Sequence, residues 1–162
     1  MPTTNPVSQN RRRFAARAAA ATAAAIALTV AATGCGQSDI TKIRIERAIA
    51  PHFAHQYAAQ AALLGHPNVT AASTHAVVDC DRGGPNVPDK GAGSNWSCKL
   101  DFDDDQRVHQ VGKVDVSINS NACYIGSGGP SALLGFTKIT DAHGHEVTNP
   151  TAEFEGCFDP TK

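Results

Sequence analysis

The chain lacks a run of apolar residues long enough to cross a membrane. Residues 18–32 form an uncharged stretch of 15 residues that are mostly alanine, whereas a membrane-spanning helix needs about 20 strongly apolar residues. Alanine is only weakly apolar, so this stretch is a poor candidate for a permanent transmembrane helix.

The main part of the chain also lacks an excess of positive charge. Four of the 14 Lys and Arg residues fall within the first 34 residues, which leaves 10 against 15 Asp and Glu and a net charge of −5. A nucleic-acid-binding surface is basic. We therefore expect no nucleic acid among the partners.

Several motifs that carry chemistry are missing. The sequence contains no C-x-x-C, the spacing of zinc and thioredoxin-like sites. Residues 126–129 read Gly-Ser-Gly-Gly, which does not match the G-x-S-x-G of hydrolases, and residues 128–130 lack the Lys and Thr of a phosphate-binding loop. These absences predict a chain that is not an enzyme and that needs no cofactor.

The N-terminus has the order of an export leader: a positive segment, an uncharged segment and then small residues before a cysteine. The positive segment holds Arg11, Arg12, Arg13 and Arg17. The sequence Ala32-Thr33-Gly34-Cys35 resembles the lipobox of bacterial lipoprotein precursors.

The lipobox resemblance implies that residues 1–34 are a signal peptide and that Cys35 takes a diacylglyceryl group and becomes the first residue of the mature chain. It places the protein at the cell membrane, lipid-anchored on the extracytoplasmic face. A chance cysteine after an ordinary signal peptide is the alternative.

The leader shows a second resemblance. Arg11-Arg12-Arg13-Phe14 is similar to the twin-arginine export motif of two Arg, any residue and Phe, with Ala15 where that family usually has a larger apolar residue. The motif implies export of a folded protein. An arginine-rich leader for the general export pathway is the alternative.

Removal of the leader leaves 128 residues, 35–162, enough for a single domain with a real core. Four cysteines remain besides Cys35, and an even number in an exported chain indicates disulfides. They are Cys80, Cys98, Cys123 and Cys157.

Four cysteines allow three pairings. Cys80 and Cys98 fall on the apolar side of their predicted strands, Cys98 in step with Trp96, so they favour one another and leave Cys123 to pair with Cys157. Four reduced cysteines are the alternative, for a chain that folds before export.

A long helix is predicted first, capped at Ser38 or Asp39 and extending to Leu64, with Gly65 as its stop signal. Pro51 lies inside this helix. Because proline removes a backbone donor, the helix is predicted to be kinked or split there.

The period of the apolar residues then changes from 3.6 to 2, which favours strands. With one helix followed by strands, we expect an α+β fold in which the helix packs on a four- to six-stranded antiparallel sheet. Gly112 is predicted to mark a bulge, and Phe154, Cys157 and Phe158 to pin the tail to the core. Strands are predicted near residues 76–80, 96–103, 114–119 and 123–125, with a hairpin from 135–140 and 145–148.

The mature part has a weaker resemblance of its own. Val77-Val78-Asp79-Cys80, Trp96-Ser97-Cys98 and Val114-Asp115-Val116 are similar to a pattern in small secreted or lipid-anchored bacterial domains of unknown function. Asp81 departs from the proline that often follows the first cysteine there, and a second cysteine pair is appended. The resemblance implies no activity.

Asp101, Asp103 and Asp105 alternate as at the start of an EF-hand loop, but Gln106 and Gly112 occupy positions that need Gly and Glu. A solvated hairpin turn is the better interpretation.

We expect a non-enzymatic binding or structural module, attached to the membrane by lipid on Cys35 and contacting an envelope protein or other envelope component. The alternative is a small-ligand or metal-binding lipoprotein that uses histidines. Its candidates are His52, His55, His143 and His145.

Overall fold

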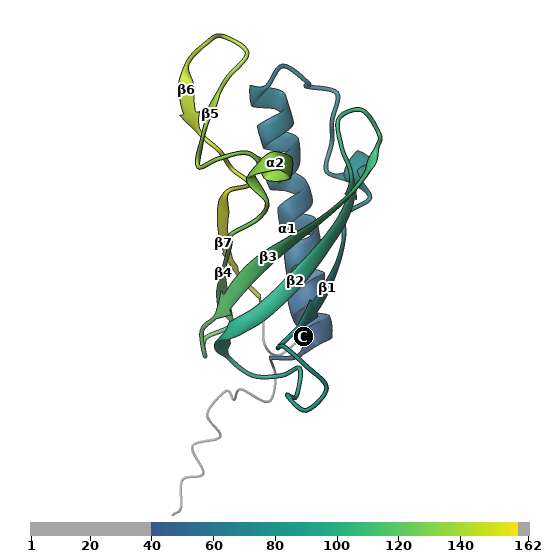
Figure 1. The fold of residues 1–162 in the computed structure, drawn as a ribbon, viewed down its shortest axis with the longest axis vertical. Coiled ribbons are helices and arrows are strands. Elements are labelled where there is room, and N and C mark those ends of the chain that lie inside the picture. The colour runs from purple at the N-terminus through teal and green to yellow at the C-terminus, as the bar shows by residue number, and fades with distance from the viewer. Residues whose placement is uncertain (1–39, 159–162) are drawn as a thin grey trace, which may run out of the picture. The chain divides into compact units, whose positions relative to one another are not determined.

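The structure is a computed structural model that describes residues 40–158. The predicted leader, the arginine motif and Cys35 lie outside the described residues. The described chain forms one long helix, an antiparallel sheet and a separate small hairpin (Figure 1). The elements are α1 (Lys42–Leu63), η2 (Ala72–Thr74), β1 (Val77–Asp81), β2 (Gly93–Asp103), β3 (His109–Ile118), β4 (Cys123–Ser127), α2 (Ser131–Leu134), β5 (Lys138–Thr140), β6 (Glu146–Thr148) and β7 (Glu153–Cys157).

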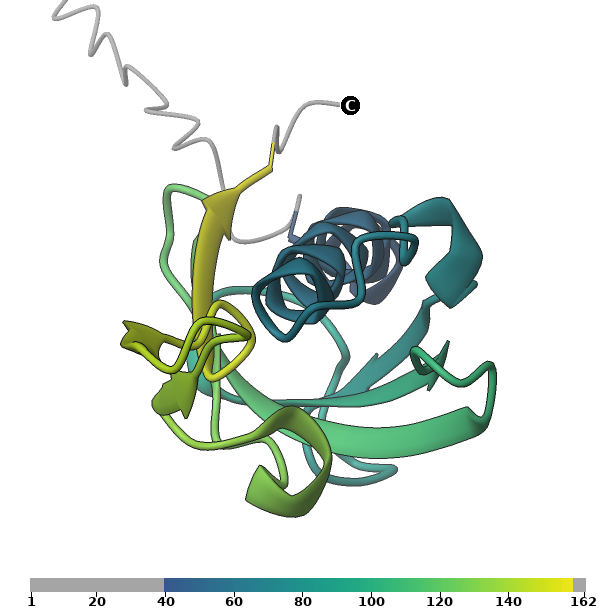
Figure 2. The same cartoon turned by 90° about the horizontal axis from the view of Figure 1, so that it is seen from above.

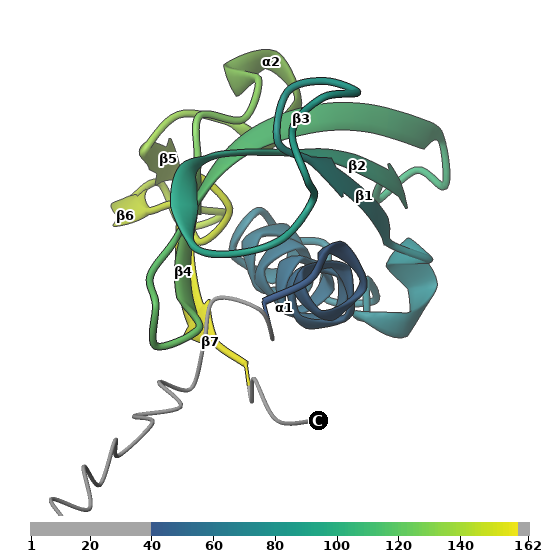
Figure 3. The same ribbon diagram turned by 90° about the horizontal axis from the view of Figure 1, so that it is seen from below.

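The main sheet has five strands in the order β1-β2-β3-β4-β7, and β5 pairs with β6 alone. Every neighbouring pair is antiparallel. The sheet curls around α1, which lies against one of its faces (Figures 2 and 3). The predicted α+β fold with one helix on an antiparallel sheet is therefore confirmed.

The core forms between α1 and the apolar face of the sheet. Alternate residues of β2 and β3 point inward, as the period of 2 predicted. The ring of Phe53 on α1 meets Phe102 on β2 edge to face, with centroids 5.0 Å apart, and Trp96 is 1 % exposed. Each such side chain contributes about 1.5–3 kcal/mol relative to an exposed position.

Helix α1 is one continuous helix of 22 residues that passes through Pro51. Of the predicted kink or split, the split is therefore wrong, and the kink stays a prediction. Ile49 and Phe53, on either side of Pro51, are fully buried in the same core, and this packing holds both halves of the helix against the sheet. Pro51 and Arg47 are exposed, so water can satisfy the Arg47 carbonyl that loses its donor. Within residues 40–158, neither α1 nor any other helix is long and apolar enough to span a bilayer.

The start of α1 also differs from the prediction. The cap position is Thr41, whose side chain makes no capping hydrogen bond, rather than Ser38 or Asp39. The chain before the helix is instead held by backbone bonds: Gly91 N donates to Ile40 O at 2.7 Å. The predicted stop at Gly65 is confirmed, since Gly65 has a φ of 93°, a conformation that favours glycine.

The predicted bulge at Gly112 is wrong. Gly112 pairs in regular register with Leu100, and the irregularity lies between Gly93 and Trp96. Gly112 lies close to the segment after β4, because a Cβ at this position would lie 3.1 Å from Leu133 Cδ2. The segment around α2 thus packs beside the first half of β3, where β4, which pairs only with Asp115–Ile118, does not reach.

The tail is held against the core, as predicted, and it forms strand β7. Phe154 is 2 % exposed, and its ring lies on Gly126, where a Cβ would approach Phe154 Cζ to 2.5 Å. Phe158 N donates to Ala122 O at 3.0 Å, which holds the end of the described chain beside the β3–β4 turn.

Both predicted disulfides are present. Cys80–Cys98 joins β1 to β2 and Cys123–Cys157 joins β4 to β7, each between residues directly opposite in the register. Cys80 and Cys98 are fully buried, as their strand parity predicted, whereas Cys157 is exposed.

Candidate functional site

The β2–β3 turn is built around Asp104. Its Oδ1 accepts hydrogen bonds from the backbone N–H groups of Gln106 and Val108, both at 2.9 Å, and its Oδ2 accepts one from Gln110 Nε2 at 2.7 Å. Burial acts to raise the pKa of Asp104, but these bonds outweigh it and the pKa is lowered. Arg107, in the same turn, has a φ of 61°, and this left-handed conformation turns the chain back toward β3.

A second segment, residues 65–75, faces this turn. Thr70 and Ser73 bond reciprocally: Thr70 N donates to Ser73 Oγ at 2.9 Å, and Ser73 N donates to Thr70 Oγ1 at 3.1 Å. The segment ends at His75, whose φ of 46° is unusual for a residue other than glycine. These bonds and this backbone turn place His75 beside β2.

Histidines and aspartates alternate where the two segments meet. His75 Nδ1 lies 2.9 Å from Asp103 Oδ2, and Asp103 Oδ1 lies 3.6 Å from His109 Nδ1. His109 Nε2 is 3.5 Å from Asp101 Oδ1, and Lys99 Nζ is 3.0 Å from Asp101 Oδ2. All are on the surface or half-buried, so each contact is worth about 1 kcal/mol or less.

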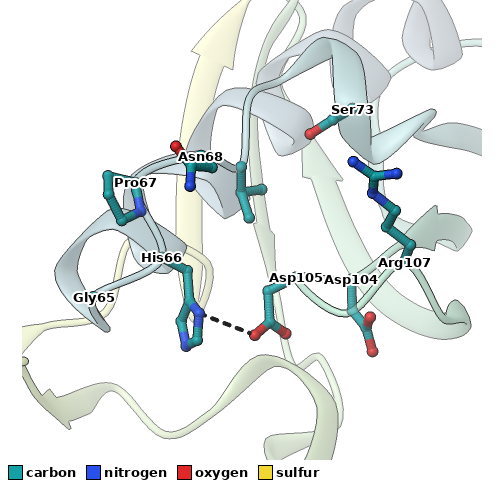
Figure 4. Close-up of a pocket in the computed structure, with 9 residues that line it drawn as sticks. Gly65, His66, Pro67, Asn68, Ser73, Asp104, Asp105 and Arg107 are labelled. Carbon is teal, nitrogen blue, oxygen red and sulfur yellow. Dashed lines mark ion pairs between the residues drawn. The ribbon is translucent and has the colours of Figure 1, made fainter.

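The space between residues 65–75 and the turn at residues 104–107 is the hairpin cleft. It consists of two hollows of about 240 and 420 Å³ that share Ser73 and Arg107. Figure 4 shows His66 and Asp105 joined across the first hollow, 3.4 Å apart, and the Arg107 guanidinium turned toward Ser73. Arg107 forms no ion pair with any residue from 40 to 158, so its charge is available to a partner.

The cleft offers charges and hydrogen-bonding groups. His75 and Asp103 are arranged like the base and carboxylate of a catalytic triad, and Ser73 is close in sequence. However, Ser73 Oγ donates its proton to Thr70 O at 2.9 Å, which ties the hydroxyl to its own turn. The geometry is better suited to holding a polar partner than to activating a nucleophile.

His52 has a structural setting between α1 and the sheet. Gln56 Nε2, which can only donate, lies 3.1 Å from His52 Nε2, so Nδ1 carries the proton and donates to Tyr124 Oη at 2.8 Å. Tyr124 in turn donates to Ala48 O at 3.4 Å. Burial, with a smaller effect from the charge of His55, lowers the pKa of His52, and burial raises the pKa of Tyr124 to about 12.

The other histidines singled out from the sequence do not join His52. His55 is exposed on α1, and His143 and His145 lie in the β5–β6 turn. Ala142 N bonds Leu63 O, so this turn sits at the end of α1, about 16 Å along the helix from His52 at 1.5 Å per residue. Among residues 40–158, no three His, Cys, Asp or Glu side chains form a group that could hold a metal.

The histidines of the hairpin cleft are ones that sequence reasoning missed. His66 and His75 are distant in sequence from their partners Asp105 and Asp103, and the β2–β3 register places His109 opposite Asp103, beside the cleft. The alternation of Asp101, Asp103 and Asp105 was a signal, and the predicted interpretation as part of a hairpin agrees with the structure.

Comparisons of the chain with protein-family models, with curated proteins and with solved structures found no match. The candidate site therefore stands on its geometry alone.

Proposed function

We propose that this chain is a lipid-anchored binding module of the bacterial cell envelope, held on the extracytoplasmic face of the cell membrane by lipid on Cys35. The support is the leader sequence that ends in Ala32-Thr33-Gly34-Cys35 and the pair of disulfides, which suits a compartment where thiols are oxidised. The hairpin cleft is its binding surface, and no catalysis is needed.

The position of the hairpin cleft carries this proposal. The cleft lies at the end of α1 opposite Ile40, because residues 65–75, which line it, follow this helix whereas Ile40 precedes it, and a helix of 22 residues is about 33 Å long. Cys35 precedes Ile40 by five residues, which span at most about 17 Å. A lipid on Cys35 would therefore keep Ile40 close to the membrane and leave the cleft facing the envelope.

The chemistry of the cleft favours a polar partner. Arg107 supplies an unpaired cation, and the His66–Asp105 and His75–Asp103 pairs supply donors and acceptors around it. A charged loop of an envelope protein or another polar envelope component fits such a surface.

A small-ligand-binding lipoprotein is the second candidate. The size of the larger hollow, about 420 Å³, favours it, because ligand pockets occupy about 300–1,000 Å³. Native mass spectrometry of protein purified without a His tag separates the candidates: a bound small molecule or metal adds a discrete mass, and a protein-binding module does not carry one.

Crosslinking in living cells tests the binding surface. A photoreactive amino acid in place of Ser73 should give a discrete crosslinked partner, whereas the same group in place of Lys113, which is exposed on the other face of the sheet, should not. Arg107→Glu should abolish the product from position 73. Equal products from both positions, or none, would contradict a binding role for the cleft.

The export route is a further proposal, supported by Arg11-Arg12-Arg13-Phe14. If the twin-arginine pathway exports this chain, replacing Arg11 and Arg12 with Lys should leave the precursor in the cytoplasm, as seen by cell fractionation. Normal export of that variant would assign the protein to the general pathway.

A further inference from the structure

The β1–β2 loop, residues 82–92, is fastened to the start of α1. Gly91 N donates to Ile40 O at 2.7 Å, Lys42 N donates to Asp89 O at 3.1 Å, and Thr41 and Lys90 form an isolated β-bridge between them. These bonds hold the loop at the point where the chain leads back to Cys35. We call the loop and the first two turns of α1 the attachment end, which Figure 3 views from below.

The attachment end exposes apolar side chains. Ile43 is 58 % exposed and Val87 is 39 % exposed. Ile43 and Arg47 are four residues apart on α1 and share one face, and Arg47 and Lys90 are exposed. The surface therefore combines isolated apolar side chains with flanking cations.

Acidic side chains in or beside the attachment end already have partners within the chain. Lys42 contacts Asp79 and lies 3.6 Å from Glu46. Asp89 Oδ1 accepts a hydrogen bond from Arg82 N at 3.0 Å. Arg47 and Lys90 make no ion pair within the described part of the chain, so their charges are left for an external anion.

We infer that the attachment end is a membrane-contacting surface, with Val87 and Ile43 in the bilayer interface and Arg47 and Lys90 at anionic lipid headgroups. This inference rests on the proposed lipid at Cys35. A tether of at most about 17 Å brings the attachment end within reach of the bilayer, and interfacial binding combines buried apolar side chains with attraction to anionic lipid.

Tryptophan quenching by lipid tests the contact. The full-length precursor is matured in cells, and the lipidated Val87→Trp protein is reconstituted in vesicles of brominated phosphatidylcholine with phosphatidylglycerol. Trp96, the only native tryptophan, is buried and provides a constant background. Val108→Trp is the matched control, because Val108 is 51 % exposed in the β2–β3 turn at the opposite end.

We expect the fluorescence that Val87→Trp adds over wild type to be largely lost in brominated vesicles, and that of Val108→Trp to be kept. Adding Arg47→Glu and Lys90→Glu should restore the Val87→Trp signal. Equal quenching of both tryptophans, or of neither, in protein that floats with the vesicles would overturn the inference and leave the anchor standing. Wild-type protein that fails to float would overturn both.

Discussion

His52 is a residue whose pKa the fold lowers. Its Nδ1 donates to Tyr124 and its Nε2 accepts from Gln56, an arrangement that only neutral imidazole can make. Burial acts in the same direction and lowers the pKa of His52 from its usual value of 6.5. The unfolded chain therefore binds a proton at a higher pH than the folded chain does.

The sign of the resulting pH dependence follows by linkage. The contribution of His52 to stability is complete above pH 6.5 and is lost as the pH falls toward the lower pKa of the folded state. We predict that His52→Gln costs about 1 kcal/mol at neutral pH through the lost hydrogen bonds, and that it reduces the decline in stability on acidification. Urea unfolding of both proteins at neutral pH and below pH 6 measures this.

His143→Gln is the matched control, because His143 is exposed in a turn, and it should decline with pH as wild type does. The His–Asp pairs of the hairpin cleft are present in all three proteins, so their effects cancel in the comparison. If His52→Gln and wild type lose the same free energy of unfolding on acidification, the assignment of His52 is wrong.

The sequence predicted the residues that follow a periodic pattern and not those that only tertiary contacts bring together. Trp96 was predicted to be in the core because it shares parity with Cys98 and Leu100, and it is buried. His75 contacts Asp103, which lies 28 positions away in the sequence. This contact depends on the left-handed backbone conformation of His75, which no sequence pattern predicts for a histidine.

At the scale of elements, α1 shows how tertiary packing overrides a local preference. Proline in a helix interior costs about 3 kcal/mol relative to alanine, yet α1 continues because both of its halves pack on the same sheet. Proline also restricts the unfolded chain, which offsets up to about 1 kcal/mol of that cost.

We therefore predict that Pro51→Ala stabilises the protein by about 2 kcal/mol, the difference between these two effects. Pro51 is exposed, so the change should leave the core intact. Pro67→Ala, in the connection after α1, is the control and should not stabilise. A lower urea midpoint for Pro51→Ala would mean that the proline contributes a contact that outweighs its missing donor.

The two disulfides close loops of 18 and 34 positions. In the chain-entropy view each contributes about 3–4 kcal/mol, a large part of the 5–15 kcal/mol that is typical for a whole domain. We predict that replacing either pair with alanine lowers the free energy of unfolding by that amount. Non-reducing peptide mapping of wild type checks the pairing, and an unchanged urea midpoint in either variant would contradict its structural role.

The strands in which apolar and polar residues alternate strictly were predicted. The elements that depend on tertiary contacts, β7 and α2, were not. β2 and β3 contain the predicted strands but begin earlier, at Gly93 and His109, because the buried alternation from which they were predicted starts only at Trp96 and Gly112. β7 contains a glycine, and its strand form depends on pairing with β4 and on the ring of Phe154. The four residues of α2 are too few for a helical period to appear in the sequence.

For the whole molecule, the prediction that matters most concerns the anchor. One acyl chain holds a protein on a membrane only marginally, whereas two hold it stably, so Cys35→Ser should either release the chain from the membrane or leave an uncleaved precursor. Cell fractionation and mass spectrometry of the N-terminus measure this. A Cys35→Ser protein that matures and fractionates like wild type would refute the lipobox assignment.

The position of the end of β7 relative to the start of α1 has a practical consequence. The start of α1 and the end of β7 lie at the same end of the domain (Figure 1), and Phe158 N, directly after β7, donates to Ala122 O in the β3–β4 turn. If Cys35 carries the proposed lipid, an epitope tag or reporter attached after β7 would start on the side of the domain that faces the membrane and would hinder its contact with the bilayer. The β5–β6 turn at Gly144, with a φ of 86° and open space around it, is the better insertion point, because a label there would extend into the envelope.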